Sequence, residues 1–285
     1  MPKVLTADAM ERLERDGFVG GIPVLTEAEV RHYRTHVDTF ERNHPEHLKK
    51  LKSKAEVLAP WILEMAGTPR LVDVFEDLWG PDLLLRNVAW RIKKPDGKVF
   101  AGWHQDTAAY GDELVPRHYL GVLALSQCDA SSGCLRMIPG SHKGPVLRHE
   151  DYDDPTSILA RGQQIVDHFD VDKAVDLELR PGEMGVFNPG IVHGSGTNTS
   201  GDARVMALIT LIPTSAQAVR RREPAILMRG VDDCHHFDEE PRPEAECSAA
   251  ELAAWKQVIE ARASVIFAHS TLAPSEAYGG SRPAA

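Results

Sequence analysis

The chain lacks several features that would mark a special class of protein. None of its apolar runs approaches the ~18 residues that a membrane-spanning helix needs. Residues 1–17 have neither the apolar centre of a secretory signal nor the acid-poor composition of a transit peptide, so we expect a cytoplasmic protein. Internal repeats and low-complexity segments are also missing. The chain is expected to be an ordinary globular protein.

Cysteine and positive charge are scarce as well. The four cysteines are too few and too scattered for a disulfide scaffold, and none forms the Cys-x-x-Cys pair of a zinc site, so we expect free thiols. The net charge of -10 repels polyanions, and the short run Arg220-Arg221-Arg222 is typical of a solvated surface. We therefore expect neither nucleic acid nor a membrane as a partner.

Apolar residues make up 42% of the 285, enough for one sizeable domain over residues 1–285. Helix signals fill residues 1–82, where a cap or a stop marks each end. These signals are Thr6 with Gly17, the capping-box pair Thr26 and Glu29, and Thr68-Pro69 with Gly80. The charged segment 41–54 is expected to be a solvated helix or loop. Residues 1–82 are thus predicted to be a helical support.

From residue 83 the apolar period changes to two, which indicates strands. We expect them near 83–92, 98–106, 119–127, 134–138, 174–180, 184–188, 191–193 and 204–212. Many short strands separated by turns predict a sandwich or jelly roll. The predicted fold class is mainly β, with a jelly-roll core over residues 83–213 and flanking helices.

Two segments do not follow the strand pattern. Residues 141–172 are long for a loop and poor in alternation, which predicts a lid or a surface excursion. After residue 213 the strand pattern ends, and Ser248 with Glu251 has capping-box spacing before an amphipathic run. Residues 214–285 are therefore expected to be an extension with one helix.

The chain contains His-x-Asp triplets, a pattern that can supply two ligands to one metal ion. They start at His36, His104, His149, His168 and His236. In a strand, residues i and i+2 point to the same face, whereas in a helix they point about 200° apart. His36 lies in a helical pattern, and the last three triplets lie in polar, turn-rich stretches that we expect at the surface. Only His104-Gln105-Asp106 follows a strand-like run.

A third ligand is expected from a distant strand. His193 is the only histidine in a strand pattern near residues 183–193, and two imidazoles with one carboxylate can hold Fe(II) on one face. Arg204 opens an apolar strand that would bury its guanidinium unless an anion meets it, and Ser195 could hydrogen-bond to the same anion. Two alternatives stay open: His193 as a core histidine, and Arg204 paired with Asp202 or Glu183.

Four motifs in order carry a family resemblance. They are Trp103-His104-Gln105-Asp106, the run from Ser132 to His142, Leu179-Arg180-Pro181-Gly182-Glu183, and His193-Gly194-Ser195-Gly196 with Arg204. Together they resemble the phytanoyl-CoA dioxygenase family of Fe(II)- and 2-oxoglutarate-dependent oxygenases. The resemblance implies a double-stranded β-helix, which is a jelly roll. It also implies iron ligation by His104, Asp106 and His193.

The same resemblance implies a site for the co-substrate. Arg204 and Ser195 would anchor the distal carboxylate of 2-oxoglutarate, and Thr107 would contact the co-substrate. Halogenating relatives lack the carboxylate ligand, so the presence of Asp106 favours hydroxylation. Many relatives have an aromatic residue where this chain has Val122.

The predicted function is a dioxygenase that uses Fe(II), 2-oxoglutarate and O2. It would hydroxylate an unactivated C–H bond of a small polar metabolite or natural-product intermediate and release succinate and CO2. The same site could instead give desaturation, cyclisation or epoxidation, and a non-redox jelly roll, an isomerase or a small-acid sensor, is the alternative from another class. We expect a small-molecule substrate and a monomer or homodimer. Candidate cavity residues are Arg86, Trp90, Arg91 and Tyr110.

Overall fold

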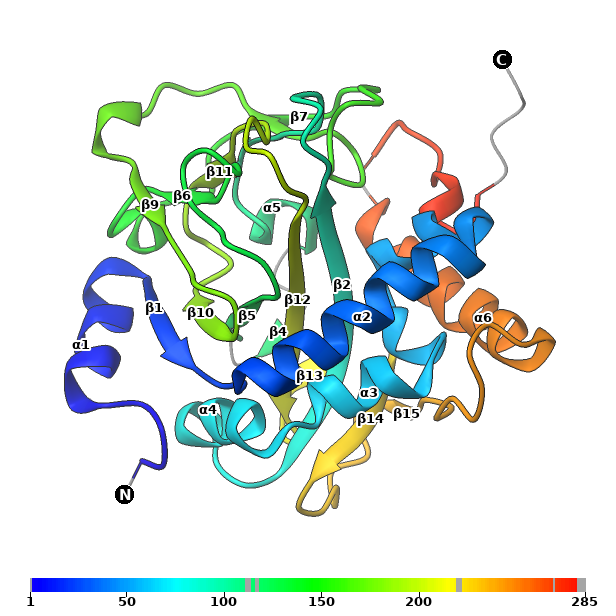
Figure 1. Cartoon of the computed structure of the whole chain (residues 1–285). Helices are drawn as coiled ribbons and strands as arrows, with labels where there is room; N and C mark the ends of the chain where they lie inside the picture. Colours follow the sequence, from blue (N-terminus) through cyan, green and yellow to red (C-terminus); the bar gives the residue numbers. More distant parts are fainter. Residues whose placement is uncertain (1, 111–113, 116–117, 219–221, 269, 281–285) are drawn as a thin grey trace.

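The computed structural model describes residues 2–110, 114–115, 118–218, 222–268 and 270–280 (Figure 1). Its larger sheet has the order β1-β10-β5-β12-β2-β14-β15. These strands are β1 (Phe18–Pro23), β10 (Glu183–Phe187), β5 (Leu120–Ala124), β12 (Arg204–Pro213), β2 (Leu83–Lys93), β14 (Pro224–Arg229) and β15 (Asp238–Glu239). Apart from the parallel pair β14 and β15, neighbouring strands are antiparallel.

A smaller antiparallel sheet faces the larger one. Its order is β3 (Ala101–His104), β11 (His193–Ser195), β6 (Leu135–Met137) and β9 (Val175–Leu177). One buried cluster joins side chains of both sheets, among them Val122 of β5, Met206 of β12 and Met137 of β6. Two short pairs complete the strands, β4 (Leu114–Val115) with β13 (Gln217–Ala218) and β7 (His149–Glu150) with β8 (Gln164–Ile165). The two packed sheets confirm the predicted jelly roll with flanking helices.

Helices cover the outer face of the larger sheet, as α2, α3 and α4 do in front of β2 and β12 in Figure 1. The α-helices are α1 (Ala7–Asp16), α2 (Glu27–Asn43), α3 (Pro60–Ala66), α4 (Pro69–Trp79), α5 (Thr107–Tyr110) and α6 (Ala249–Ile266). Short 3-10 turns are η1 (Pro45–Lys52), η2 (Ala55–Val57), η3 (Ser141–Lys143), η4 (Val171–Lys173) and η5 (Glu276–Tyr278). The largest core cluster joins side chains from α2, α3, α4 and α6 with those of β2 and β12. Burying these apolar stripes is what holds the helices on the sheet.

The helix ends follow from local chemistry. Thr6 accepts the Ala9 N–H, and Gly17 ends α1 in the left-handed conformation at φ 89°. Thr26 and Glu29 form the predicted capping box in both directions. At α6 Ser248 is the N-cap, but the Glu251 carboxylate accepts the backbone N–H groups of Glu244 and Ala245. The predicted starts of α1 and α2 are confirmed. The helix α6 also starts where expected, but its capping hydrogen bonds differ from those of the predicted capping box.

Three strands of the larger sheet were not predicted, namely β1, β14 and the two-residue strand β15. β1 contains Gly20 and Gly21, and a register shift between Val19 and Ile22 interrupts its pairing with β10. β14 pairs with β2, so the prediction that the strand pattern ends at residue 213 was wrong. Glycine and proline weaken strand signals in a sequence, and sheet pairing supplies the missing stability.

The segment 41–54 is not simply solvated, which corrects a second prediction. Leu51 and Lys54 are buried, and Lys54 has a left-handed backbone at φ 54°. The Lys54 Nζ donates to the carbonyls of Arg86, at 2.6 Å, and Pro224, at 2.8 Å, and forms an ion pair with Glu240. Burial raises the Glu240 pKa well above its ordinary value. This cluster ties residues 41–54 to β2 and to the chain after β14.

The other expectations of surface and composition have mixed outcomes. Among the described residues there is no helix long and apolar enough to cross a membrane. All four cysteines are free. Arg222 forms an exposed ion pair with Asp238, whereas Arg220 and Arg221 lie outside the described residues.

Candidate metal centre

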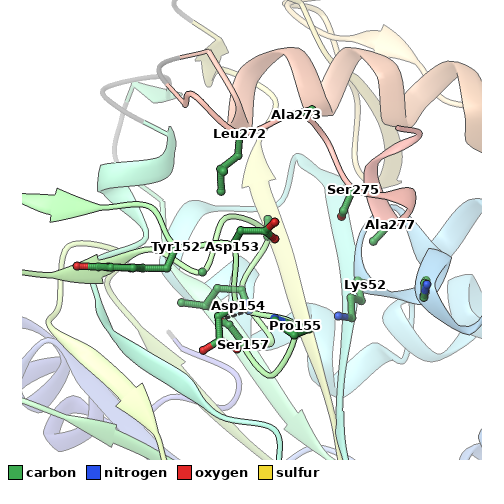
Figure 2. A pocket seen from close by; sticks show the side chains of 14 residues that line it. Lys52, Tyr152, Asp153, Asp154, Pro155, Ser157, Leu272, Ala273, Ser275 and Ala277 are labelled. Carbon is green, nitrogen blue, oxygen red and sulfur yellow. Dashed lines mark hydrogen bonds between the residues drawn. The ribbon is translucent and has the colours of Figure 1, made fainter. Parts of the chain in front are cut away.

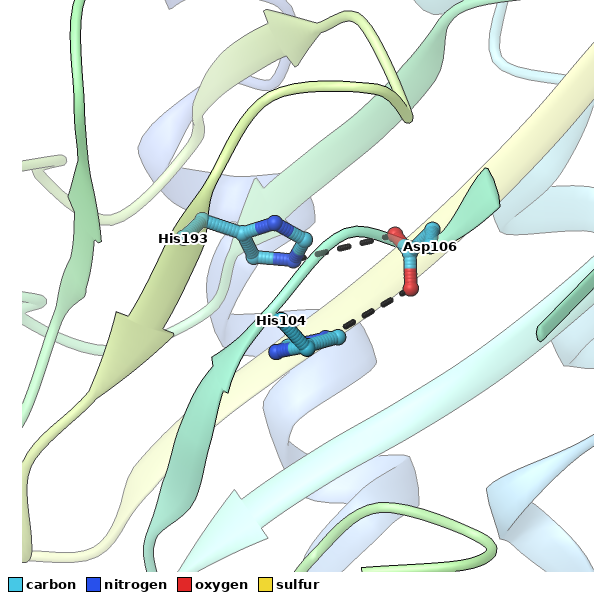
Figure 3. Close-up of side chains that lie close together, drawn as sticks. All are labelled: His104, Asp106 and His193. Carbon is cyan, nitrogen blue, oxygen red and sulfur yellow. Dashed lines mark ion pairs between the residues drawn. The ribbon is translucent and has the colours of Figure 1, made fainter. Parts of the chain in front are cut away.

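The smaller sheet brings His104, Asp106 and His193 together. His104 ends β3, His193 begins β11, and the two residues are direct partners in the antiparallel ladder. Asp106 follows β3 by two residues, so its carboxylate points to the same side as the His104 imidazole. One ligand atom from each residue lies within 4.8 Å of the others, and all three side chains are buried (Figure 3). These distances suit one shared metal ion.

Backbone carbonyls fix the direction of both imidazoles. Nδ1 of His104 lies 2.8 Å from the Gly102 carbonyl oxygen, and Nδ1 of His193 lies 3.0 Å from that of Ile191. Each Nδ1 therefore carries the hydrogen, which leaves the lone pair on Nε2. The Nε2 atoms face the Asp106 carboxylate, at 3.5 Å for His104 and 3.7 Å for His193. The Nε2 lone pairs of both histidines are therefore directed toward the same position, which an oxygen of the Asp106 carboxylate also faces.

The protonation states match those of metal ligands. Burial by itself would raise the Asp106 pKa, but the adjacent imidazoles of His104 and His193, together with Arg91, lower this pKa to about 2. Burial and the neighbouring His104 lower the His193 pKa to about 4. At neutral pH the centre therefore presents an ionised Asp106 and a neutral His193, the forms that bind metal.

The remaining triplets are placed elsewhere, with one correction. His36 lies in α2 and His168 is exposed, as predicted. His236 is partly buried, with its Nδ1 3.0 Å from the Ala216 carbonyl oxygen. His149 is not a plain surface residue, because it is half-buried and its Nε2 accepts the Gln105 N–H at 3.0 Å. His149 thus joins the 141–172 segment to Gln105, the residue between His104 and Asp106.

Gln105 carries further bonds to both sides of the centre. Its Nε2 donates to the Gly190 carbonyl at 2.8 Å, and its Oε1 accepts the Leu147 N–H at 2.8 Å. The 141–172 segment also runs beside β3, where the Ile158 N–H donates to the Phe100 carbonyl at 2.8 Å. Arg161, which forms an ion pair with Asp151 inside the segment, connects it to the end of α6 by donating to the Ile266 carbonyl. The segment is docked against the centre, whereas lid movement stays a prediction.

A cavity of about 260 Å³ lies beyond this segment (Figure 2). Its walls come from residues 152–162, from Lys49 and Lys52 of η1 and from residues 272–277. None of the three candidate metal ligands lines it. This cavity is therefore separate from the metal centre.

Arg204 is buried at the start of β12, as its apolar strand predicts. It is 1% exposed, its guanidinium donates to the carbonyls of Gly133 and Arg91, and its Nε is buried without a hydrogen-bond partner. No carboxylate of the described residues forms an ion pair with it, so the pairing with Asp202 or Glu183 is not observed. Burial lowers the Arg204 pKa to about 10. A buried cation without a counter-charge indicates an anion site.

Ser195 is bonded to a residue that the sequence did not single out. The Lys93 Nζ donates to the Ser195 Oγ at 2.7 Å and also to the Gly196 carbonyl. Lys93 is 1% exposed and stands directly opposite Arg204 in the β2–β12 ladder. The Arg204 guanidinium, the Lys93 amine and the Ser195 hydroxyl are therefore linked through neighbouring strands. The alternating pattern of β2 was the only available signal for Lys93.

Unpartnered polar atoms mark where ligands fit. The Asp106 Oδ2, the Thr107 Oγ1 and the Arg204 Nε are all buried and lack a hydrogen-bond partner in the described part of the chain. Thr107 begins α5, and its N–H donates to the Pro189 carbonyl at 3.2 Å. Buried polar groups without partners are uncommon in native proteins, and bound ligands often satisfy them. The three positions suit a metal ion and an anionic co-substrate.

The other cavity candidates have different outcomes. Arg86 forms a buried ion pair with Glu223, so it has a structural partner. Trp90 faces the helices, with its ring 5.6 Å from that of Trp61, so of its two expected roles, cavity wall or sheet packing, it has the second. Arg91 is near enough to lower the Asp106 pKa. The side chain of Tyr110 lies outside the described residues. Only Arg91 remains a candidate near the metal centre.

The motifs, the jelly roll and the His-Asp-His geometry agree with a family model. The phytanoyl-CoA dioxygenase (PhyH) model matches residues 4–206. The chain belongs to this family. A probable phytanoyl-CoA dioxygenase of Caenorhabditis elegans is 29% identical over 145 residues, which are 49% of this chain and 46% of that protein. The chain matches a little under half the length of the phytanoyl-CoA dioxygenases that resemble it.

Other members resemble more of the chain. An L-proline trans-4-hydroxylase of Streptomyces griseoviridis is 26% identical over 231 residues, covering 71% of this chain and 85% of that protein. The solved structure of the non-heme monooxygenase ThoJ, in its apo form, has a TM-score of 0.78 and 26% identity. It covers 90% of this chain and 96% of its own. The predicted family and fold are thus confirmed, and the named relatives are oxygenases or hydroxylases.

Proposed function

We propose that this family member is an Fe(II)- and 2-oxoglutarate-dependent dioxygenase that hydroxylates a small polar molecule. The observation that carries the proposal has two buried parts, which the chain connects through β11, where His193 and Ser195 are two residues apart. One part is the His104, Asp106 and His193 cluster, and the other is the Arg204 guanidinium, which has no carboxylate partner in the described chain. A metal that binds a 2-oxo acid and a cation that binds its distal carboxylate are the two needs of such an enzyme.

The chain's own residues have definite parts in this proposal. His104, Asp106 and His193 hold the iron, Arg204 and Ser195 hold the distal carboxylate of 2-oxoglutarate, and the Thr107 hydroxyl is available to the co-substrate. Iron, 2-oxoglutarate and O2 bound there supply an oxidant strong enough for an unactivated C–H bond, with succinate and CO2 as by-products. The protein supplies orientation and a closed site.

Orientation comes from the contacts around the ligands. The Gly102 and Ile191 carbonyls fix the tautomer and direction of the imidazoles. Gln105 ties the β3 end to the docked 141–172 segment, which keeps bulk water from the centre. Asp106 occupies the position that a halide would need, so hydroxylation is favoured over halogenation.

Relatives support the size and chemistry of the substrate. The relative that matches 71% of this chain is named for hydroxylation of L-proline, which is a small polar metabolite. We extend this class, a small polar metabolite or natural-product intermediate, to the present chain. We also propose that the protein acts in the cytoplasm, as a monomer or homodimer. Desaturation or ring formation at the same site would be recognised by a product that has lost two hydrogens instead of gaining one oxygen.

Binding and turnover can be tested separately. Under anaerobic conditions, Fe(II) and 2-oxoglutarate should together give the visible charge-transfer absorption of an iron–2-oxo acid chelate. Asp106→Ala should weaken iron binding and so lower this absorption. Arg204→Met should weaken 2-oxoglutarate binding by at least about 30-fold, since losing one member of a buried charge pair costs ~2–5 kcal/mol. Arg222→Met, at an exposed ion pair, is the matched control and should change nothing.

Turnover is measured as oxygen uptake and succinate release with a panel of small metabolites. Succinate should form in step with one oxidised product. Unchanged 2-oxoglutarate affinity in Arg204→Met would contradict the proposed anchor and favour a non-redox metal-binding protein. Absence of the absorption band in the wild-type protein would refute the proposed function itself.

A further inference from the structure

Lys93 is a buried titratable residue that the proposed chemistry does not yet use. It ends β2, is 1% exposed, and stands opposite Arg204, which begins β12. The charged or titratable groups that act on it are the Arg204 guanidinium and the thiols of Cys134 and Cys128. Both thiols are buried, and burial raises their pKa to about 12 and about 11, so they are uncharged at neutral pH. In the described chain, no carboxylate balances the two neighbouring cations.

The contacts of the Lys93 ammonium are specific. It donates to the Ser195 Oγ at 2.7 Å, to the Gly196 carbonyl, and at 3.4 Å to the Gly133 carbonyl, which also accepts from Arg204. In its charged form Lys93 can only donate, so its hydrogen occupies a lone pair of the Ser195 oxygen and the Ser195 hydroxyl hydrogen points away from Lys93. Lys93 thus sets the direction in which the Ser195 hydroxyl can donate a hydrogen bond.

The backbone around Lys93 is fixed as well. Asn198 donates to the Lys93 carbonyl at 2.9 Å and to the Asp202 carbonyl at 2.8 Å, which holds the β11–β12 loop against the end of β2. The backbone at Gly133 can lie close to Gly196 because glycine has no side chain. A Cβ at this position would meet the Gly196 carbonyl oxygen at 2.5 Å. The ammonium therefore stays beside Ser195 without needing to move. A side chain held in place in this way can orient the neighbouring Ser195 hydroxyl.

We propose that Lys93 is a positioning residue of the co-substrate site. Its ammonium directs the Ser195 hydroxyl toward the distal carboxylate of a 2-oxo dicarboxylate and adds a second positive charge beside Arg204. This inference rests on the proposed function. It also defines the ligand class, because two cations at one end favour a dicarboxylate over a 2-oxo acid with an apolar tail.

Coupling between ligand binding and protonation follows from this arrangement. Burial and the adjacent Arg204 lower the Lys93 pKa to about 6, so most Lys93 side chains are uncharged at pH 7.5 before a ligand binds. A bound carboxylate favours the charged form and raises this pKa. Binding of 2-oxoglutarate should therefore take up close to one proton, whereas 2-oxopentanoate, which lacks the distal carboxylate, should take up none.

Calorimetry measures this uptake directly. The Fe(II)-loaded protein is titrated anaerobically with 2-oxoglutarate at pH 7.5 in two buffers of different ionisation enthalpy. Wild-type protein should show the uptake, and Lys93→Met should bind roughly 10- to 100-fold more weakly without it. Lys93→Arg keeps a cation that does not titrate, so it should recover affinity but not proton uptake. Lys94→Met, at an exposed lysine paired with Glu41, is the matched control.

Each outcome has a distinct meaning. Unchanged affinity and uptake in Lys93→Met overturn the inference, as does full proton uptake in Lys93→Arg, because the proton then comes from another group. Wild-type binding without uptake overturns it too, while leaving the proposed function intact. If wild-type protein does not bind 2-oxoglutarate at all, the proposed function fails first and the inference fails with it. Melting temperatures of all variants check that they are folded.

Discussion

Glu223 offers a quantitative test of how a buried ion-pair cluster stabilises the contact between β2 and α6. Its carboxylate pairs with Arg86 of β2 at 2.5 Å and with Arg262 of α6 at 3.2 Å, and all three side chains are buried. Glu223→Gln keeps the shape but removes the charge. The two guanidinium groups then lose the carboxylate between them, a change that costs ~3–5 kcal/mol at buried sites.

The pH dependence gives an independent magnitude. Burial would raise the Glu223 pKa, but Arg86 and Arg262 outweigh it and lower the pKa from 4.5 to about 2. A carboxyl with a depressed pKa stabilises the fold above its unfolded pKa, and this stability is lost as the pH falls toward the folded value. The full contribution is roughly 3 kcal/mol at neutral pH. It should disappear between about pH 4.5 and pH 2.

Denaturant unfolding followed by tryptophan fluorescence measures both quantities. At pH 7 Glu223→Gln should lose about 3 kcal/mol relative to wild type, and this difference should shrink as the pH is lowered through 4. Glu239→Gln, at a nearby exposed carboxylate, should be nearly neutral. A loss under about 1 kcal/mol at pH 7, or a difference that stays constant with pH, would refute this reasoning.

Two further variants test the centre and the segment docked on it. Gly133→Ala places a Cβ 2.5 Å from the Gly196 carbonyl oxygen at a φ of 71°, so it should lower both thermal stability and 2-oxoglutarate affinity, whereas Gly201→Ala, with open space around it, should not. A titration that gives equal affinities for the two variants would contradict this. Arg161→Met removes the tie to α6 and should raise hydrogen exchange over residues 151–162, and Arg148→Met, an exposed arginine of the same segment, should leave that exchange unchanged.

Local signals were enough for the features that local chemistry decides. The ends of α1 and α2 depend on bonds made within one helical turn, which the residues Thr6, Gly17, Thr26 and Glu29 specify directly. Apart from the two-residue strands β4, β7 and β8, the strands over residues 83–213 were predicted within a few residues, because alternation of apolar residues reflects burial of one face. The convergence of His104 and Asp106 also follows from strand geometry.

Features decided by pairing could not be predicted in this way. One extra residue, Arg86, interrupts the register between β2 and β12, and this bulge changes which later side chains face the helices. The side that Trp90 faces could therefore not be decided from the sequence. Lys93 could be recognised only after β2 was aligned with β12, which places it opposite Arg204. The buried Lys54 was hidden by a charged segment, since its partner Glu240 is distant in the sequence.

The pairing of β2 with β12 has a consequence for folding. Lys93 and Arg204 occupy the last rung of a ladder that extends to the pair of Leu83 with Pro213. A slip of one residue would turn one of the two cations to the opposite face and dismantle the anchor. A ligand that needs both cations binds only the correctly aligned chain and draws the population toward it by mass action. Binding of the co-substrate would then also favour the correct register between β2 and β12.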